Sequence, residues 1–194
     1  MQRCKIADHC NWHLIANIII IVSSLFIGCT KSNNIARDKD KIDIIIKKYF
    51  SPDYSLMRNS LDTLTNKYFK ENYSKSDPYL IEGDFDGNDL TDVAVVLQKN
   101  ENNIKITSFA ILLQTIRGCY KSVFIADVGT MLSDIYIIPV GAGEVVRQTE
   151  SIDVPMKQIK LKNKAVTLVY YGKSAVVYYW DESKQNIDSI WTSD

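Results

Sequence analysis

This chain of 194 residues has no excess of charge of either sign, because its 23 Lys and Arg are balanced by 23 Asp and Glu. Without a basic excess there is no electrostatic footprint for a phosphate backbone, so we expect no nucleic-acid partner. Glycine and proline are also few, at 8 and 4 residues, while 46% of the chain is hydrophobic and 24% is charged. These values exclude collagen-like, disordered and multi-pass membrane chains and predict an ordinary globular domain.

The first 28 residues have the organisation of an export segment. Arg3 and Lys5 lie near the start, and residues 14 to 28 form an uncharged, largely apolar run. A helix of that length spans about 22 Å, short of the roughly 30 Å hydrocarbon core of a bilayer. The sequence therefore favours a cleaved signal peptide over residues 1–28, with an uncleaved signal anchor as the alternative.

The junction that follows, Phe26-Ile27-Gly28-Cys29, resembles the lipobox of bacterial lipoproteins, although Phe26 stands where leucine is usual. In that family a small residue precedes a cysteine that is acylated, with chains such as palmitate, and becomes the mature N-terminus. The resemblance implies that Cys29 carries lipid and that the membrane is a partner through this anchor. Because Thr30 stands where Asp would favour inner-membrane retention, it also implies an outer-membrane location facing the periplasm in a Gram-negative organism.

The polar stretch behind the cysteine separates the anchor from the domain. Residues 30–40 lack hydrophobic periodicity, as expected of a short solvated linker. We therefore predict a signal peptide over 1–28, a lipidated cysteine with a polar leash over 29–40, and a single domain over 41–194.

Removal of the signal peptide on export would leave the domain with few reactive side chains. Both histidines of the chain lie within its first 13 residues, so the mature protein would have none. That absence excludes Ser-His-Asp and Cys-His catalysis and histidine-containing metal sites. Two of the four cysteines would leave with the signal peptide and Cys29 would be blocked by lipid. We therefore expect Cys119 to be the only thiol of the domain, with no intrachain disulfide.

Hydrophobic spacing predicts helices first and strands afterwards. One helical face is formed by Ile42, Ile45, Ile46, Tyr49 and Phe50. Pro52 must end this helix. The spacing recurs at Met57, Leu61, Leu64 and Tyr68, which predicts two helices or one interrupted helix.

The rest of the chain is a series of short β-rich runs, at residues 92–98, 104–113, 120–128, 134–140, 158–161, 166–171, 175–180 and 187–192. No connection is long enough for a crossover helix, so the sheet should be antiparallel and the fold class α+β, with about eight strands in a meander. Turns are predicted at 163–164, 172–173 and 181–185. We expect the aromatic residues of the last strands to fill a core rather than form a ligand platform.

One loop concentrates negative charge. Six carboxylates and no Lys or Arg lie between Asp77 and Gln98, an arrangement that is self-repulsive without a cation. Oxygen ligands fall at alternate positions, namely the side chains of Asp84, Asp86, Asn88 and Asp92 and the carbonyl of Leu90. A loop around a hard cation points every second residue inward, so this spacing predicts a Ca²⁺ site. The alternative is an Asx-rich turn whose acids are merely solvated.

From Gly83 to Val95 this loop is similar to the calcium loop of FG-GAP or VCBS-type repeats, which run Gly-Asp-Phe-Asn-Gly-Asp-Gly-x-x-Asp-Leu-Ala-Val. The resemblance implies the same five ligand positions. Val95 stands where an EF-hand needs a bidentate glutamate, which excludes that motif. Asp89 replaces a glycine of the repeat, which costs strain if φ is positive there. A single copy excludes a propeller, and the chain as a whole resembles small exported bacterial proteins of unknown function.

These features predict a non-enzyme, namely an envelope-tethered, Ca²⁺-stabilised binding or scaffolding module whose partner is an envelope protein or a glycan. One alternative is a hydrolase that uses carboxylates alone, since no other acid–base groups remain. Another is an inhibitor or immunity lipoprotein that acts on an envelope enzyme.

Overall fold

The structure is a computed structural model that describes residues 39–58, 61–115, 119–130, 133–149 and 156–192. The predicted signal peptide, the predicted lipidation site Cys29 and most of the predicted leash lie outside the described residues. In chain order the elements are α2 (Lys39–Tyr49), β1 (Tyr54–Leu56), α3 (Thr63–Tyr73), β2 (Leu80–Gly83), β3 (Asp92–Glu101), β4 (Ile104–Gln114), β5 (Tyr120–Thr130), β6 (Ile135–Val140), β7 (Val145–Arg147), β8 (Gln158–Lys160), β9 (Ala165–Tyr170), β10 (Ser174–Asp181) and β11 (Asn186–Thr192).

The first predicted helix is confirmed as α2. It buries Ile42, Ile45 and Ile46, as the spacing predicts, and it ends at Tyr49, three residues before Pro52. The helix begins at Lys39, so the last two residues of the predicted leash are helical.

The second predicted helix is displaced along the chain. Met57 and Leu61 are buried, but they lie before α3, which begins at Thr63 behind the N-cap Asp62. On α3 itself Leu64 is 70% exposed, while Phe69 is buried. The four residues spaced like a helical stripe therefore do not share one helix, because Met57 and Leu61 lie before α3 while Leu64 and Tyr68 lie on it.

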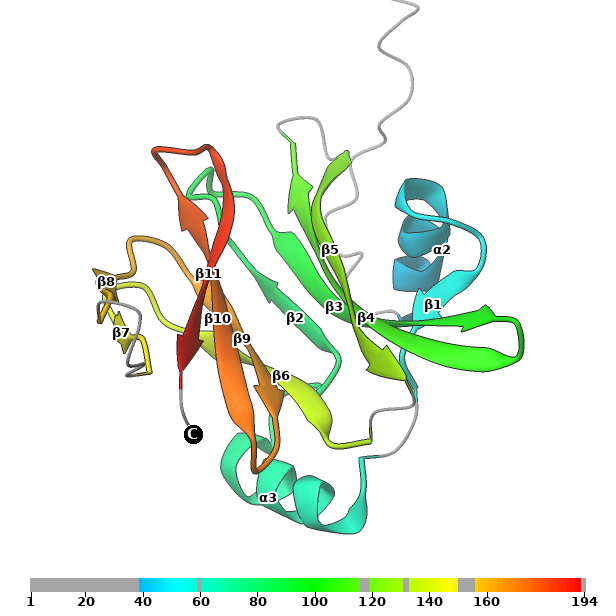
Figure 1. Ribbon diagram of the computed structural model, residues 1–194. Helices are drawn as coiled ribbons and strands as arrows, with labels where there is room; N and C mark the ends of the chain where they lie inside the picture. Colours follow the sequence, from blue (N-terminus) through cyan, green and yellow to red (C-terminus); the bar gives the residue numbers. More distant parts are fainter. Residues whose placement is uncertain (1–38, 59–60, 116–118, 131–132, 150–155, 193–194) are drawn as a thin grey trace, which may run out of the picture.

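Two antiparallel sheets form the body of the domain (Figure 1). In the first, β3 and β4 pair along their length, β5 follows β4, and the other edge of β3 is shared by the short strands β1 and β2. The second sheet has the order β11-β10-β9-β6. The α+β order and the antiparallel pairing are therefore confirmed, and neither sheet closes into a propeller. The described residues contain eleven strands, because β1, β2 and β7 add to the predicted runs.

The main core lies between the two sheets. Phe109 of β4 is fully buried and its ring centroid lies 4.7 Å from that of Tyr178 on β10. Helix α2 lies beside the outer side of the first sheet, and α3 lies at one end of the molecule (Figure 1). The expectation that the aromatic residues of the last strands fill a core is confirmed for Tyr178 and Tyr179, whereas Trp191 is 56% exposed.

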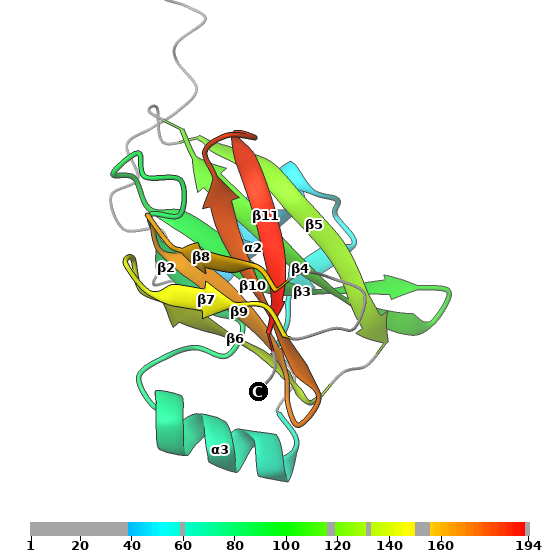
Figure 2. The same cartoon turned by 60° about the vertical axis from the view of Figure 1, so that its left-hand side comes forward.

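The small hairpin β7–β8 covers the outer face of the second sheet (Figure 2). Its Val146 packs with Leu161, Val177 and Tyr179 in a separate apolar cluster. The predicted turn at 163–164 does not join two paired strands, because β8 pairs with β7 while β9 pairs with β6 and β10. The turns at 172–173 and 181–185 do join paired strands.

One expectation about sulfur chemistry is wrong. Cys119 is disulfide-bonded, and its partner lies outside the described residues. Neither described helix is long and apolar enough to cross a bilayer.

Candidate metal centre

The acidic loop, residues 84–91, joins β2 to β3 at one end of the first sheet. Phe85 anchors it, since its side chain is 2% exposed within the main core. The loop turns back through two left-handed residues, Gly87 with φ +80° and Asp89 with φ +63°. Asp89 therefore adopts the strained conformation that its replacement of a glycine led us to expect, one that aspartate tolerates better than most residues.

Asp92, the first residue of β3, is fully buried. Its Oδ2 accepts a hydrogen bond from the backbone N–H of Phe85 at 2.7 Å, and its Oδ1 accepts one from the N–H of Gln114 at 2.7 Å. This carboxylate thus ties the acidic loop to the end of β4. For Asp92 the alternative of a merely solvated acid is wrong.

Asp84 organises the turn itself. Its two carboxylate oxygens accept from the N–H groups of Gly87, Asn88 and Asp89 at 2.7 to 3.1 Å. Asp86 accepts from both the backbone N–H and the side-chain amide of Asn88 at 3.2 and 3.1 Å. Within the part of the chain that the structure describes, the donors to the carboxylate oxygens of Asp84, Asp86 and Asp92 are neutral N–H groups, so no cationic side chain offsets the charge of these oxygens.

Three of the predicted ligands come together in space. Asp84, Asp86 and Asp92 each offer a carboxylate oxygen, and these oxygens lie within 4.8 Å of one another. Burial raises the pKa of Asp92 to about 6; the two N–H bonds oppose the rise, and the charges of Asp86 and Asp84 add to it. Burial also raises the pKa of Asp86, to which the Asp84 carboxylate contributes. The protein thus concentrates negative charge where it is poorly hydrated.

The other two predicted ligands are arranged differently. Asn88 directs its amide nitrogen toward Asp86 and toward the carbonyl of Gln114, while its Oδ1 accepts from the N–H of Leu90 at 2.8 Å. Leu90 is half-buried, and its carbonyl as a ligand stays a prediction. Asn88 thus links the acidic loop to the end of β4 through the hydrogen bond from its side-chain amide to the Gln114 carbonyl.

Gln114 is the participant that sequence reasoning missed. Its N–H reaches Asp92, its carbonyl accepts from Asn88, and its Oε1 accepts from the N–H of Thr91 at 3.1 Å. It lies 22 positions beyond Asp92 in the chain, and no local pattern marks a polar residue at a strand end as a loop partner.

The donor set fits a hard divalent cation. Each carboxylate oxygen has two acceptor sites, so oxygens that already accept one N–H retain a lone pair for a metal. Three carboxylates with nearby carbonyl and amide oxygens are the ligands that Ca²⁺ prefers, and the neutral donors around them leave their charge for an ion to balance.

Comparison of the chain with protein-family models, with curated proteins and with solved structures finds no match.

Proposed function

We propose that this protein is an envelope-tethered lipoprotein whose domain is a Ca²⁺-stabilised binding or scaffolding module. The ion site is supported by the close approach of the Asp84, Asp86 and buried Asp92 carboxylates, whose hydrogen-bond donors among the described residues are neutral N–H groups. Bound Ca²⁺ offsets the repulsion among these carboxylates and holds the acidic loop against the end of β4. The ion's role is structural.

The arrangement of Asp92 argues against the carboxylate-only hydrolase. A general acid or a nucleophile must reach its substrate, but Asp92 is fully buried and both of its oxygens accept backbone N–H bonds. Asp84 is occupied by three N–H groups of its own turn. No observation favours the inhibitor or immunity alternative over a binding module.

Thermal unfolding of the full chain in detergent solution tests the ion site. If Ca²⁺ binds the folded state alone, stability rises as RT ln(1 + [L]/Kd), about 2.7 kcal/mol when the ion is at a hundred times Kd. At this size that corresponds to an increase in Tm of roughly 5 to 10 °C. Mg²⁺ should raise Tm much less, because it requires a smaller, near-octahedral shell.

Two variants separate ligation from charge. The double variant Asp84→Asn with Asp92→Asn should abolish the Ca²⁺ shift. Asp89→Asn is the matched control, because it removes a negative charge from the same loop without removing a predicted ligand, and asparagine tolerates the positive φ there. If the wild type and the double variant melt identically with Ca²⁺ and with chelator, the loop is only a polar turn.

Mass spectrometry of protein extracted from membranes tests the tether. We expect an acylated N-terminus at Cys29 and no peptide from residues 1–28. The other cysteines of the chain are Cys4, Cys10 and Cys29, so cleavage after Gly28 and acylation of Cys29 would remove every residue that could hold the intrachain disulfide of Cys119. Digestion with and without reductant therefore distinguishes the lipidated chain from the disulfide-bonded one. An unmodified Met1 in the membrane fraction, or a peptide that joins Cys119 to Cys4, Cys10 or Cys29, would contradict lipidation.

A further inference from the structure

Helix α2 turns an apolar side chain toward solvent. Its inner side buries Ile42, Ile45 and Ile46, whereas Ile44 is 68% exposed. Among the described residues only Leu64 of α3, at 70%, exposes a large hydrophobic side chain more fully. The packing of α2 on the first sheet therefore does not account for an isoleucine at position 44.

Two lysines adjoin this isoleucine. Lys47 and Lys48 follow Ile44 by three and four positions, the spacing at which side chains are neighbours on a helix surface. Both are exposed, and neither makes a hydrogen bond or an ion pair with any residue that the structure describes. The Lys48 ammonium lies 5.1 Å from the ring centroid of Tyr49, which leaves its N–H groups free to donate to an anion. We call Ile44, Lys47 and Lys48 the outer face of α2.

The one acid among the described side chains of α2 does not offset these lysines. Asp43 accepts a hydrogen bond from the N–H of Leu56 at 2.8 Å and pairs with the guanidinium of Arg58. Its carboxylate thus holds β1 and the segment after it against the helix. The outer face of α2 combines an exposed apolar side chain with two unpaired positive charges, a composition typical of helices that lie on anionic membrane surfaces.

The predicted tether enters the domain at this helix. Residues 30–38 separate the predicted lipidation site Cys29 from Lys39, where α2 begins. These nine residues span at most about 32 Å when fully extended. Lipid on Cys29 would therefore keep the start of α2 within that distance of the bilayer.

The alternative anchor, an uncleaved segment 1–28, would bring the membrane to the same helix. Cys119 is disulfide-bonded, and every other cysteine of the chain lies within the first 29 residues. The residue after Cys119, Tyr120, donates its N–H to the hydroxyl of Tyr49 at 3.0 Å, at the end of α2. An intrachain disulfide would thus hold the anchor segment beside α2.

We propose that the outer face of α2 docks on the surface of the membrane that carries the tether. Ile44 enters the boundary between headgroups and acyl chains, and Lys47 and Lys48 pair with anionic lipid headgroups. This proposal rests on the proposed envelope tether and adds the orientation of the domain. The hairpin β7–β8 lies on the opposite side of the molecule from α2, so it would face away from the membrane (Figure 1 and Figure 2). Occupation of the acidic loop by Ca²⁺ is not required.

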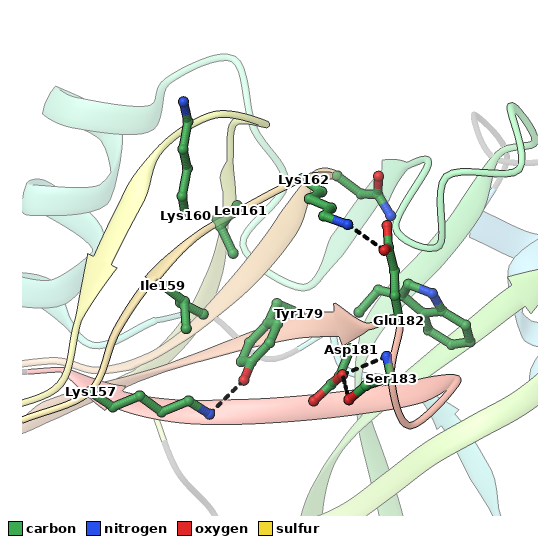
Figure 3. A pocket seen from close by; sticks show the side chains of 11 residues that line it. Lys157, Ile159, Lys160, Leu161, Lys162, Tyr179, Asp181, Glu182 and Ser183 are labelled. Carbon is green, nitrogen blue, oxygen red and sulfur yellow. Dashed lines mark hydrogen bonds and ion pairs between the residues drawn. The ribbon is translucent and has the colours of Figure 1, made fainter. Parts of the chain in front are cut away.

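The reactivity of individual lysines tests the docking. The full chain is inserted from detergent solution into preformed vesicles, treated with a membrane-impermeant acetylating reagent and analysed by mass spectrometry. Lys160 of β8 is the internal reference, because it is exposed and points away from the second sheet (Figure 3). In vesicles of phosphatidylcholine with phosphatidylglycerol, Lys47 and Lys48 should be acetylated at least about threefold more slowly, relative to Lys160, than in detergent, because an anionic surface attracts each basic residue.

Lipid charge and salt separate docking from other contacts. Vesicles of phosphatidylcholine alone should protect Lys47 and Lys48 less, and about 0.5 M NaCl should remove most of the protection because salt screens exposed charges. Equal reactivity in detergent and in anionic vesicles would overturn the proposal. Protection that appears in detergent and rises with protein concentration would also overturn it, since a second copy of the chain would then cover this face.

Two matched substitutions locate the contact. Ile44→Gln should reduce the protection of Lys47 and Lys48 to less than about half, because it removes the apolar part of the contact. Leu64→Gln is the control, since it makes a similar change at an equally exposed helix position on α3, at one end of the molecule (Figure 1). Both positions are exposed, so neither change should alter Tm appreciably. Equal losses of protection in the two variants would contradict docking through α2.

Flotation of the vesicles in a density gradient separates this proposal from the tether. A chain that floats with neutral and anionic vesicles, but whose Lys47 and Lys48 react as in detergent, would leave the tether standing and the docking wrong. A chain that floats only with anionic vesicles, with these lysines protected, would support the docking and contradict the tether. A chain that floats with neither would overturn both.

Discussion

The buried carboxylate of Asp92 should reverse the usual response of protein stability to acid. Its pKa in the folded protein is about 6, raised from 3.8 chiefly by burial. Between these two values the folded state binds more protons than the unfolded state, so stability falls as pH rises. The stabilisation is complete below pH 4 and is lost as pH rises through about 6. This applies to the protein free of Ca²⁺.

The magnitude follows from the size of the shift. About two pKa units at 1.36 kcal/mol per unit amount to about 3 kcal/mol. At this chain length the loss corresponds to a fall in Tm of roughly 6 to 12 °C between pH 4 and pH 7. Burial also raises the pKa of Asp86, which acts in the same direction. The pKa of Asp188 is lowered to about 2, so its stabilisation is lost only as pH falls below this window.

Asp92→Asn isolates the contribution, because it removes the titrating group while keeping the shape. An amide has one acceptor oxygen, so either the Phe85 or the Gln114 N–H loses its acceptor, at a cost of about 1 to 3 kcal/mol. The variant should therefore be less stable than the wild type at pH 4 and about equal to it at pH 7.

Thermal melts of both proteins in calcium-depleted buffer, at several pH values between 4 and 7, measure the difference. Taking the difference between the two proteins cancels the groups that titrate alike in both. Millimolar Ca²⁺ should remove the fall in the wild type, because the ion requires the ionised carboxylate. If the stability difference between the two proteins is the same at every pH, Asp92 does not titrate in this range and the reasoning from its burial is wrong.

Three further comparisons test the fold and the loop. Phe109→Ala should lower the free energy of unfolding in urea by about 3 to 5 kcal/mol, and the exposed Ile104→Ala by no more than about 0.5 kcal/mol; similar losses would contradict the packing of the two sheets. Asn103→Val should cost about 1 to 2 kcal/mol in the same assay because φ is +64° there, whereas Asn103→Gly should cost nothing. Gly87→Ala should lower Tm and reduce the Ca²⁺ shift, because φ is +80° and the new Cβ would meet Asn163; an unchanged shift would contradict the close approach of the acidic loop to Asn163.

The spacing of hydrophobic residues was sufficient to locate a helix or strand wherever that element buries one of its faces. The stripe at Ile42, Ile45 and Ile46 located α2, and alternating or continuous apolar runs located eight of the described strands to within about three residues at each end. The second helix was misplaced because hydrophobic residues three or four positions apart do not show where a helix begins when its N-cap lies within the stripe. Asp62 is the N-cap of α3, and Met57 and Leu61 are buried before this helix begins.

For the candidate site, the sequence by itself determined which oxygens lie in the loop and at what spacing. Only the tertiary structure decided that Asp92 is buried, that Gln114 closes the loop from β4, and that Asn88 turns its amide nitrogen toward Asp86. The pairing of β8 with β7, which places this hairpin on the outer face of the second sheet, was likewise set by the whole fold. Hydrophobic periodicity specifies which face of a strand is buried, but the partner of that strand depends on which arrangement of the complete chain buries all such faces together.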